Sequence, residues 1–119
     1  MNIIVADDDK MLSAMICGVL NENGHITLPA YDAIQTMMYV MKQPPDLLIL
    51  DIKMPGGTGL SVLRKLKSST KTSFVPVIVI SGIDDPNLPA EVAELGAKRF
   101  LAKPIDPDIL IETVRDVFR

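Results

Sequence analysis

Residues 46–60 read DLLILDIKMPGGTGL and decide the fold. The stretch opens with an apolar run from Leu47 to Leu50, which is typical of a buried strand in a parallel sheet. The run ends at Asp51, and a glycine-rich turn at 56–59 leads into leucines at helical spacing. The stretch therefore predicts a strand, a polar strand end, a turn and a helix in direct succession.

The same succession repeats on both sides of this stretch. Further strands are expected at Ile3–Ala6, His25–Pro29, Val77–Ile80 and Phe100–Ala102, each followed by apolar residues at helical spacing. Five strands alternating with five helices predict an α/β fold with a parallel sheet covered on both faces. Because crossovers between parallel strands are right-handed, the sheet is expected to be doubly wound.

The helical segments also predict which side chains face the core. Met11 lies off the inward stripe beside a run of acidic residues, in a position to contact a partner. Pro86 and Pro89 predict a short fourth helix. The methionines at helical spacing are interpreted as core fillers, because methionine adapts to irregular gaps. The stripes expected on one helix face are Ile34, Met37, Met38 and Met41 in the second helix, and Leu110, Val114 and Phe118 in the last.

Length, charge and cysteine content exclude several classes of protein. The 119 residues suit one domain, taken as 1–119, that is large enough to bury a core. A net charge of −3 argues against direct nucleic-acid binding, which needs a basic face. The apolar runs are too short to span a membrane, and the first residues do not resemble a signal peptide. Cys17 is the only cysteine, which fits a reducing, cytoplasmic location.

Polar residues stand where the predicted strands end, which is where doubly wound folds form their sites. Converging carboxylates repel one another, and Mg²⁺, or Mn²⁺ in its place, relieves that repulsion. A carboxylate is also a nucleophile toward phosphorus, and a cation, an ammonium and a hydroxyl can each hold an oxygen of the transferred group. The residues are Asp7, Asp8 and Asp9 after the first strand, Asp51 after the third, Ser81 after the fourth and Lys103 after the fifth.

Each of these residues also has a simpler interpretation. An acidic residue after a strand often caps the next helix, and this is the role expected for Asp9. Asp51 alone fits a turn residue, and a single lysine such as Lys103 is usually a solvated charge. His25 is expected to be an ordinary surface residue. A purely structural explanation requires all four strand ends to be polar by coincidence, so the sequence favours a site.

With these residues in place, the chain resembles the receiver domains of two-component response regulators over essentially its whole length. The matching segments are IIVADDD, DLLILDIKMPGGTGL, VIVISG and FLAKPI. The resemblance implies a flavodoxin-like fold with strand order 2-1-3-4-5. It also implies phosphorylation by a histidine kinase or a histidine phosphotransfer protein, and a conformational switch that acts on a downstream effector protein or domain.

The resemblance assigns a role to each acidic residue of the site. Asp51 corresponds to the phosphoacceptor. Asp7 and Asp8 correspond to the acidic pair that holds Mg²⁺ together with Asp51 and the backbone carbonyl of Lys53. The side chains of Lys53 and Ile83 correspond to positions that flank the approach of water to the phosphorus. They are therefore expected to set the rate of dephosphorylation.

The remaining matches concern the phosphoryl group and the switch. Ser81 and Lys103 correspond to residues that contact the phosphoryl oxygens. Ser81 also corresponds, with Phe100, to the pair that couples phosphorylation to the conformational change. The resemblance further implies a cis peptide bond between Lys103 and Pro104, a bond type in which cis is accessible.

Two other functions compete with this interpretation. A phosphohydrolase of the haloacid dehalogenase type would use Asp7 as nucleophile and Asp9 as acid, but residues 51–55 would then have no role. A receiver-like module that binds partners without phosphorylation is opposed by the complete set of site residues. A nucleotide-binding domain is weaker still, because the chain has neither G-x-x-x-x-G-K-[ST] nor G-x-G-x-x-G.

Overall fold

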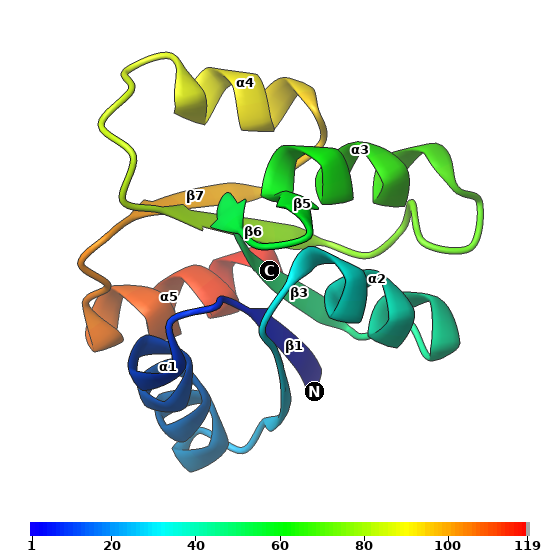
Figure 1. Cartoon of the computed structure of the whole chain (residues 1–119). Coiled ribbons are helices and arrows are strands. Elements are labelled where there is room, and N and C mark those ends of the chain that lie inside the picture. The colour runs from blue at the N-terminus through cyan, green and yellow to red at the C-terminus, as the bar shows by residue number, and fades with distance from the viewer. Residues whose placement is uncertain (119) are drawn as a thin grey trace.

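The computed structural model describes residues 1–118 and has a doubly wound α/β fold (Figure 1). One parallel sheet has the order β2-β1-β3-β6-β7, with β1 at Asn2–Ala6, β2 at Ile26–Ala30, β3 at Leu47–Asp51, β6 at Val77–Ser81 and β7 at Arg99–Ala102. The helices are α1 Lys10–Glu22, α2 Ala33–Lys42, α3 Gly59–Ser68, α4 Leu88–Glu94 and α5 Pro107–Val117. The predicted fold and strand order are confirmed. A small antiparallel hairpin, β4 Lys53–Met54 and β5 Gly57–Thr58, was not predicted.

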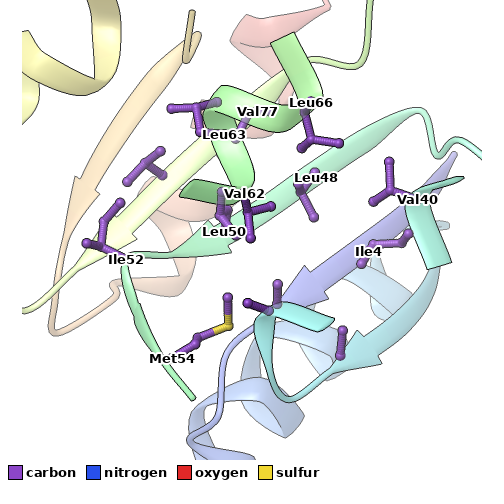
Figure 2. Close-up of a cluster of buried hydrophobic side chains, with 14 of the residues drawn as sticks. Ile4, Val40, Leu48, Leu50, Ile52, Met54, Val62, Leu63, Leu66 and Val77 are labelled. Atoms are coloured by element: carbon purple, nitrogen blue, oxygen red, sulfur yellow. The ribbon is translucent and has the colours of Figure 1, made fainter. Parts of the chain in front are cut away.

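The sheet divides the core into two halves. Helices α1 and α5 cover one face, and α2, α3 and α4 cover the other (Figure 1). Successive residues of a strand point to opposite faces, so Leu48 and Leu50 join the α2–α4 core while Leu47 and Ile49 join the α1–α5 core. Figure 2 shows side chains of α2 and α3 directed onto the sheet in the first of these cores. Every residue of β3 is buried, which explains its uninterrupted apolar run.

Aspartate caps fix where three of the helices begin. Each cap carboxylate accepts hydrogen bonds from backbone N–H groups that would otherwise lack a partner. The caps are Asp9 on α1, Asp32 on α2 and Asp106 on α5. The cap role expected for Asp9 is therefore confirmed. Helix α4 has only 7 residues, as the two prolines predicted.

The face that α2 turns to the core was predicted wrongly. Met38 and Met41 are 61% and 43% exposed, and Ile34 is 64% exposed. The side chains of α2 that are buried are Ala33, Thr36 and Val40. Both sets follow helical spacing and are offset by one residue, so periodicity fits either set. The prediction of the inward face therefore rested on the larger, more apolar side chains. The smaller set faces inward, and the expected core role of Met38 and Met41 is incorrect.

The end of α5 was also predicted wrongly. Leu110 and Val114 are buried, as expected, but Phe118 is 45% exposed. Helix α5 ends at Val117, and Phe118 is the C-cap residue. Because the backbone leaves the helical path there, the spacing that placed Phe118 inward no longer applies. Met11, expected off the inward stripe, is 86% exposed.

The turn between β3 and α3 requires glycine at position 59. Gly59 N–H donates to the carbonyl of Ile52 at 2.7 Å, which presses the first residue of α3 against the end of β3. A Cβ at this position would lie 2.7 Å from Ile52 Cα and would collide with the carbonyl oxygen of Asp51. The absence of a side chain at Gly59 therefore lets α3 begin beside Asp51.

Replacement of Gly59 by alanine is predicted to destabilise the fold. The collision is with backbone, which cannot rotate away, so Gly59→Ala should lower the free energy of unfolding by about 3 kcal/mol. Gly18 is the matched control, because a Cβ there meets nothing within 4 Å. Gly18→Ala should stabilise α1 by up to about 1 kcal/mol. Urea denaturation followed by circular dichroism measures both, and equal stabilities of the two variants would contradict this account.

Candidate functional site

The carboxyl ends of four strands converge at one edge of the sheet. The register pairs Ala6 with Leu50 and Ser81 with Ala102, so the residues at or just after these strand ends lie side by side. Asp7, Asp51 and Ser81 are almost fully buried there, and the side chain of Lys103 is 23% exposed. Four residues that the sequence singled out therefore come together in one cluster.

Asp7 is held by backbone contacts at the end of β1. Its N–H donates to the carbonyl of Ala30 at 3.0 Å, and its Oδ1 accepts from Asp9 N–H at 2.9 Å. Its Oδ2 is buried and accepts no well-aligned hydrogen bond, although Lys103 Nζ lies 3.1 Å away. The contact with Lys103 is best described as an ion pair. One oxygen of Asp7 is therefore available to a further cation.

Lys103 bridges two carboxylates. Its Nζ lies 3.1 Å from Asp7 Oδ2 and 3.3 Å from Asp51 Oδ2. Burial alone would lower the pKa of Lys103, but the two carboxylates outweigh it and raise the pKa. The backbone N–H of Lys103 donates to Ser81 O at 2.8 Å, and the peptide bond to Pro104 is cis. The ammonium is thus fixed between β1 and β3 in its charged form.

The surroundings of Asp51 shift the pKa of its carboxyl group. Burial raises its pKa, and the neighbouring charge of Asp7 raises it further. Lys103 and the backbone N–H of Lys53 act in the opposite direction, and the resulting pKa is about 6. Because that value lies below neutral pH, the carboxylate is ionised at pH 7, although its charge is poorly solvated.

Three carboxylates are arranged as ligands for a cation. One oxygen each from Asp7, Asp8 and Asp51 lies within 4.8 Å of the others, and Asp8 is exposed at the rim. The underused Oδ2 of Asp7 and the all-oxygen donor set fit a hard divalent ion such as Mg²⁺. Lys53 N lies 3.4 Å from Asp51 Oδ1, so the residue whose carbonyl was expected to contribute is adjacent to the cluster.

The remaining predicted residues surround this cluster. Ser81 Oγ accepts from Ile83 N–H at 3.0 Å, which holds the hydroxyl at the end of β6. Ile83 is 44% exposed, and the side chain of Lys53 is exposed. Phe100 lies further back on β7, paired with Val79 and partly buried against the α2–α4 core. Phe100 therefore belongs to the layer behind the cluster.

Sequence reasoning missed one structural support of the site. Hairpin β4–β5 pairs Lys53 with Thr58, and this pairing fixes the loop that follows Asp51. Pro55 O accepts from Ala33 N–H at 3.0 Å, which ties the same loop to the start of α2. Strands of two residues give no periodic signal, so the glycine pair at 56 and 57 was the only available indication.

The family profile described as "Response regulator receiver domain" matches residues 3–115. The chain belongs to this family. Receiver domains of this kind are the response regulator modules of two-component systems, which confirms the family inferred from the sequence. The competing haloacid dehalogenase interpretation is not favoured, and Asp9, its required acid, already caps α1 with its carboxylate.

Among proteins similar to this receiver domain, sporulation initiation phosphotransferase F of Bacillus subtilis (strain 168) is 31% identical over 113 residues, covering 95% of this chain and 90% of that protein. The phosphate regulon transcriptional regulatory protein PhoB of Escherichia coli (strain K12) is 29% identical over 117 residues. The match covers 98% of this chain but only 51% of PhoB, so the chain spans about half the length of that relative.

Solved receiver domains share the architecture. The Francisella response regulator 1452 receiver domain superposes with a TM-score of 0.90 at 30% identity, covering 98% of this chain and 95% of that one. The chemotaxis response regulator CheY4 of Vibrio cholerae gives a TM-score of 0.91 at 24% identity, covering 98% and 97%, and supports the fold alone. Across residues 1–118, no helix combines the length and the apolar character needed to cross a membrane.

The electrostatics of Asp51 predict how stability depends on pH in the metal-free protein. Folding raises the pKa of Asp51 from 3.8 to about 6, so the folded state binds the proton more tightly than the unfolded state does. The stability that this proton contributes is therefore lost as pH rises through this window. Asp51→Asn removes the titrating charge. With chelator present, the variant should match the parent near pH 4 and exceed it by about 2 kcal/mol at pH 7.

Chemical denaturation of both proteins at several pH values measures this difference. Glu22→Gln at the exposed end of α1 serves as control and should show no pH-dependent gain of that size. A parent protein that remains as stable as Asp51→Asn at pH 7 would show that Asp51 carries no electrostatic penalty.

Proposed function

We propose that this receiver domain accepts a phosphoryl group on Asp51 from a phosphohistidine of a partner protein and changes conformation as a result. The observation that carries the proposal is the position of Asp51. It is a buried carboxylate that is nonetheless ionised at neutral pH, with an ammonium 3.3 Å away. A nucleophile for phosphorus needs this charge, and the transferred group needs the neighbouring cation.

The proposed transfer is a displacement at phosphorus. An oxygen of Asp51 forms the new O–P bond while the P–N bond of the donor phosphohistidine breaks. The electron pair of that bond leaves with the donor imidazole, which then takes a proton from solvent. Lys103 is placed to pair with one phosphoryl oxygen, since its Nζ already contacts the Asp51 carboxylate.

A divalent cation has a defined place in this proposal. Asp7, Asp8, Asp51 and the backbone carbonyl of Lys53 are the groups that would hold Mg²⁺, with Mn²⁺ as an alternative. When bound, the ion supplies positive charge that offsets the negative charge of the phosphoryl group. Asp7 is oriented for this role through its Oδ1, which is fixed by Asp9 N–H and leaves Oδ2 for charge pairing.

Phosphorylation is proposed to act through Ser81 and Phe100. The Ser81 hydroxyl accepts from Ile83 N–H in the unmodified protein, and it can turn to donate to a phosphoryl oxygen on Asp51. That movement draws the loop after β6 toward the site and opens space beside Phe100, which is only partly buried. The result is a population shift between two packings that a downstream effector distinguishes.

The wider assignment follows from the same site. We infer that residues 1–119 act as one receiver domain, whose phosphodonor is a histidine kinase or a histidine phosphotransfer protein. The net charge of −3 supports protein partners over direct nucleic-acid contact by this chain. A cytoplasmic location is part of the proposal, and the single cysteine, Cys17, agrees with a reducing compartment.

Phosphorylation is predicted to depend on the acidic cluster and on a divalent cation. With acetyl phosphate as donor, the parent should be labelled in Mg²⁺ and not in excess chelator. Asp8→Asn should slow labelling at least tenfold, because one ligand charge is lost while the fold is kept at this exposed position. Asp46→Asn is the control, because Asp46 lies at the opposite end of β3 from the site. The amide oxygen of the substituted asparagine can still accept the hydrogen bond from Asn2 N–H.

Labelling is measured as the mass increase of the intact protein over time. Equal rates for Asp8→Asn and Asp46→Asn, or full labelling in chelator, would show that the acidic cluster does not support the reaction. Either result would remove the metal from the proposal.

The lifetime of the phosphoryl group is predicted to depend on two flanking side chains. The branched Ile83 obstructs the in-line approach of water, and the exposed Lys53 can fold over the phosphoryl oxygens. Lys53→Asn and Ile83→Glu should therefore each lose phosphate several-fold faster than the parent after removal of the donor. Slower loss in Lys53→Asn would show instead that Lys53 stabilises the transition state of hydrolysis.

A further inference from the structure

Helix α2 presents a second apolar face that this domain does not use. Ile34, Met38 and Met41 are 64%, 61% and 43% exposed and recur at spacings of four and three residues, which places them on one side of the helix. The core contacts of α2 are made by a different set of residues. Covering these large apolar side chains would remove apolar surface from water, which favours association. A contiguous exposed stripe of this kind marks an interaction surface.

The stripe borders a groove between α2 and α3. The two helices lie side by side on the same face of the sheet (Figure 1). The groove has a volume of about 390 Å³ and reaches the glycine pair of the loop after β3. Its walls include Ile34, Met37, Met38 and Met41 from α2, with Ser61 and Lys65 from α3.

The walls of the groove select a helical occupant. The two long walls are helices whose backbone groups bond within their own helix, so an extended peptide would meet only the two-residue strand β5 at one end of the groove. A helical segment satisfies its own backbone and offers only side chains. Methionines suit such an occupant, because their flexible thioether chains adapt to an apolar stripe. A helix with apolar residues at the same three- and four-residue spacings matches α2.

The charge around the groove selects an acidic occupant. Among the described residues that line the groove, Lys65 is the only charged one, and none is acidic. Helix α2 itself has no acidic residue and ends in Lys42. The nearest acids in sequence, Asp32 and Asp46, each accept a hydrogen bond from a backbone N–H. Lys65 lines the groove and therefore meets the polar edge of any bound helix.

We propose that the α2–α3 groove binds an amphipathic helix of a partner protein, with an apolar stripe on Ile34, Met38 and Met41 and acidic residues against Lys65. This function goes beyond the phosphoacceptor role and does not rest on it. A second copy of the same face is a poorer occupant. Pairing it with itself would bring a lysine, Lys65, from each copy to the same interface, and like charges oppose association.

The test uses a designed probe and the intact chain. The probe is a fluorescein-labelled synthetic peptide of about 18 residues, or about five helical turns, with leucines along one stripe flanked by glutamates. Binding is measured by fluorescence anisotropy. Two control peptides have the same length: one contains the same residues in an order that breaks the stripe, and the other has lysines in place of the glutamates. The acidic stripe peptide should bind saturably, and the two controls should bind at least tenfold more weakly.

Variants on the protein locate the binding site. Met38→Gln should weaken binding of the acidic peptide about tenfold, because one apolar contact is lost from the centre of the stripe. Lys65→Glu should weaken it several-fold and should improve binding of the lysine peptide. Phe74→Gln is the matched control, since Phe74 is 66% exposed but does not line the groove, and its affinity should stay within about twofold.

Several results would overturn the proposal. They include equal binding of the stripe and broken-stripe peptides, equal affinity of Met38→Gln and Phe74→Gln, or no binding of the acidic peptide. Sedimentation of the protein alone supplies a further test. If the parent self-associates and Met38→Gln does not, the stripe serves a second copy and the partner helix is rejected. All four proteins are first compared by thermal unfolding, and the substituted side chains are exposed enough to leave the fold unchanged.

Discussion

The site is organised around two buried carboxylates, Asp7 and Asp51, that share one ammonium group. Lys103 lies 3.1 Å and 3.3 Å from them and joins the ends of three strands electrostatically. Burial raises the pKa of Asp51 and the charge of Asp7 raises it further, and the single ammonium offsets these effects only in part, which leaves a pKa of about 6. A bound cation, or a change in the charge of Asp51, will therefore alter the balance of charge in the cluster.

The rest of the fold keeps this cluster in place. Parallel pairing brings the strand ends to one edge, and the two cores hold every residue of β3 out of water. Gly59 allows α3 to start against the end of β3, and the β4–β5 hairpin fixes the loop that carries Lys53. In the proposed switch, a chemical change at Asp51 acts on the loops after β3 and β6, whose backbone N–H groups at Lys53 and Ile83 contact Asp51 and Ser81. The α2–α3 groove reaches the first of these loops, so a helix bound there would contact it.

The sequence predicted most of the fold and the composition of the site because both depend on local order. Apolar runs such as Leu47–Leu50 end directly at polar residues, and parallel topology then forces those ends together. The face of α2 was not predictable from periodicity, since Ala33, Thr36 and Val40 form a stripe as regular as that of the methionines. The space between α2 and the sheet decides which of the two stripes faces inward. The β4–β5 hairpin is too short for any pattern, and the shared contacts of Lys103 depend on three strands far apart in sequence.

The central claim is that Asp51 is the residue that receives the phosphoryl group. Its most direct test is reductive trapping. The protein is treated with acetyl phosphate and Mg²⁺, and borohydride then converts an aspartyl phosphate to homoserine, which peptide mass spectrometry locates. The account predicts homoserine at position 51, with Asp7, Asp8 and Asp9 intact. Homoserine at position 7, or at none of these positions in a protein that gains phosphate mass, would contradict it.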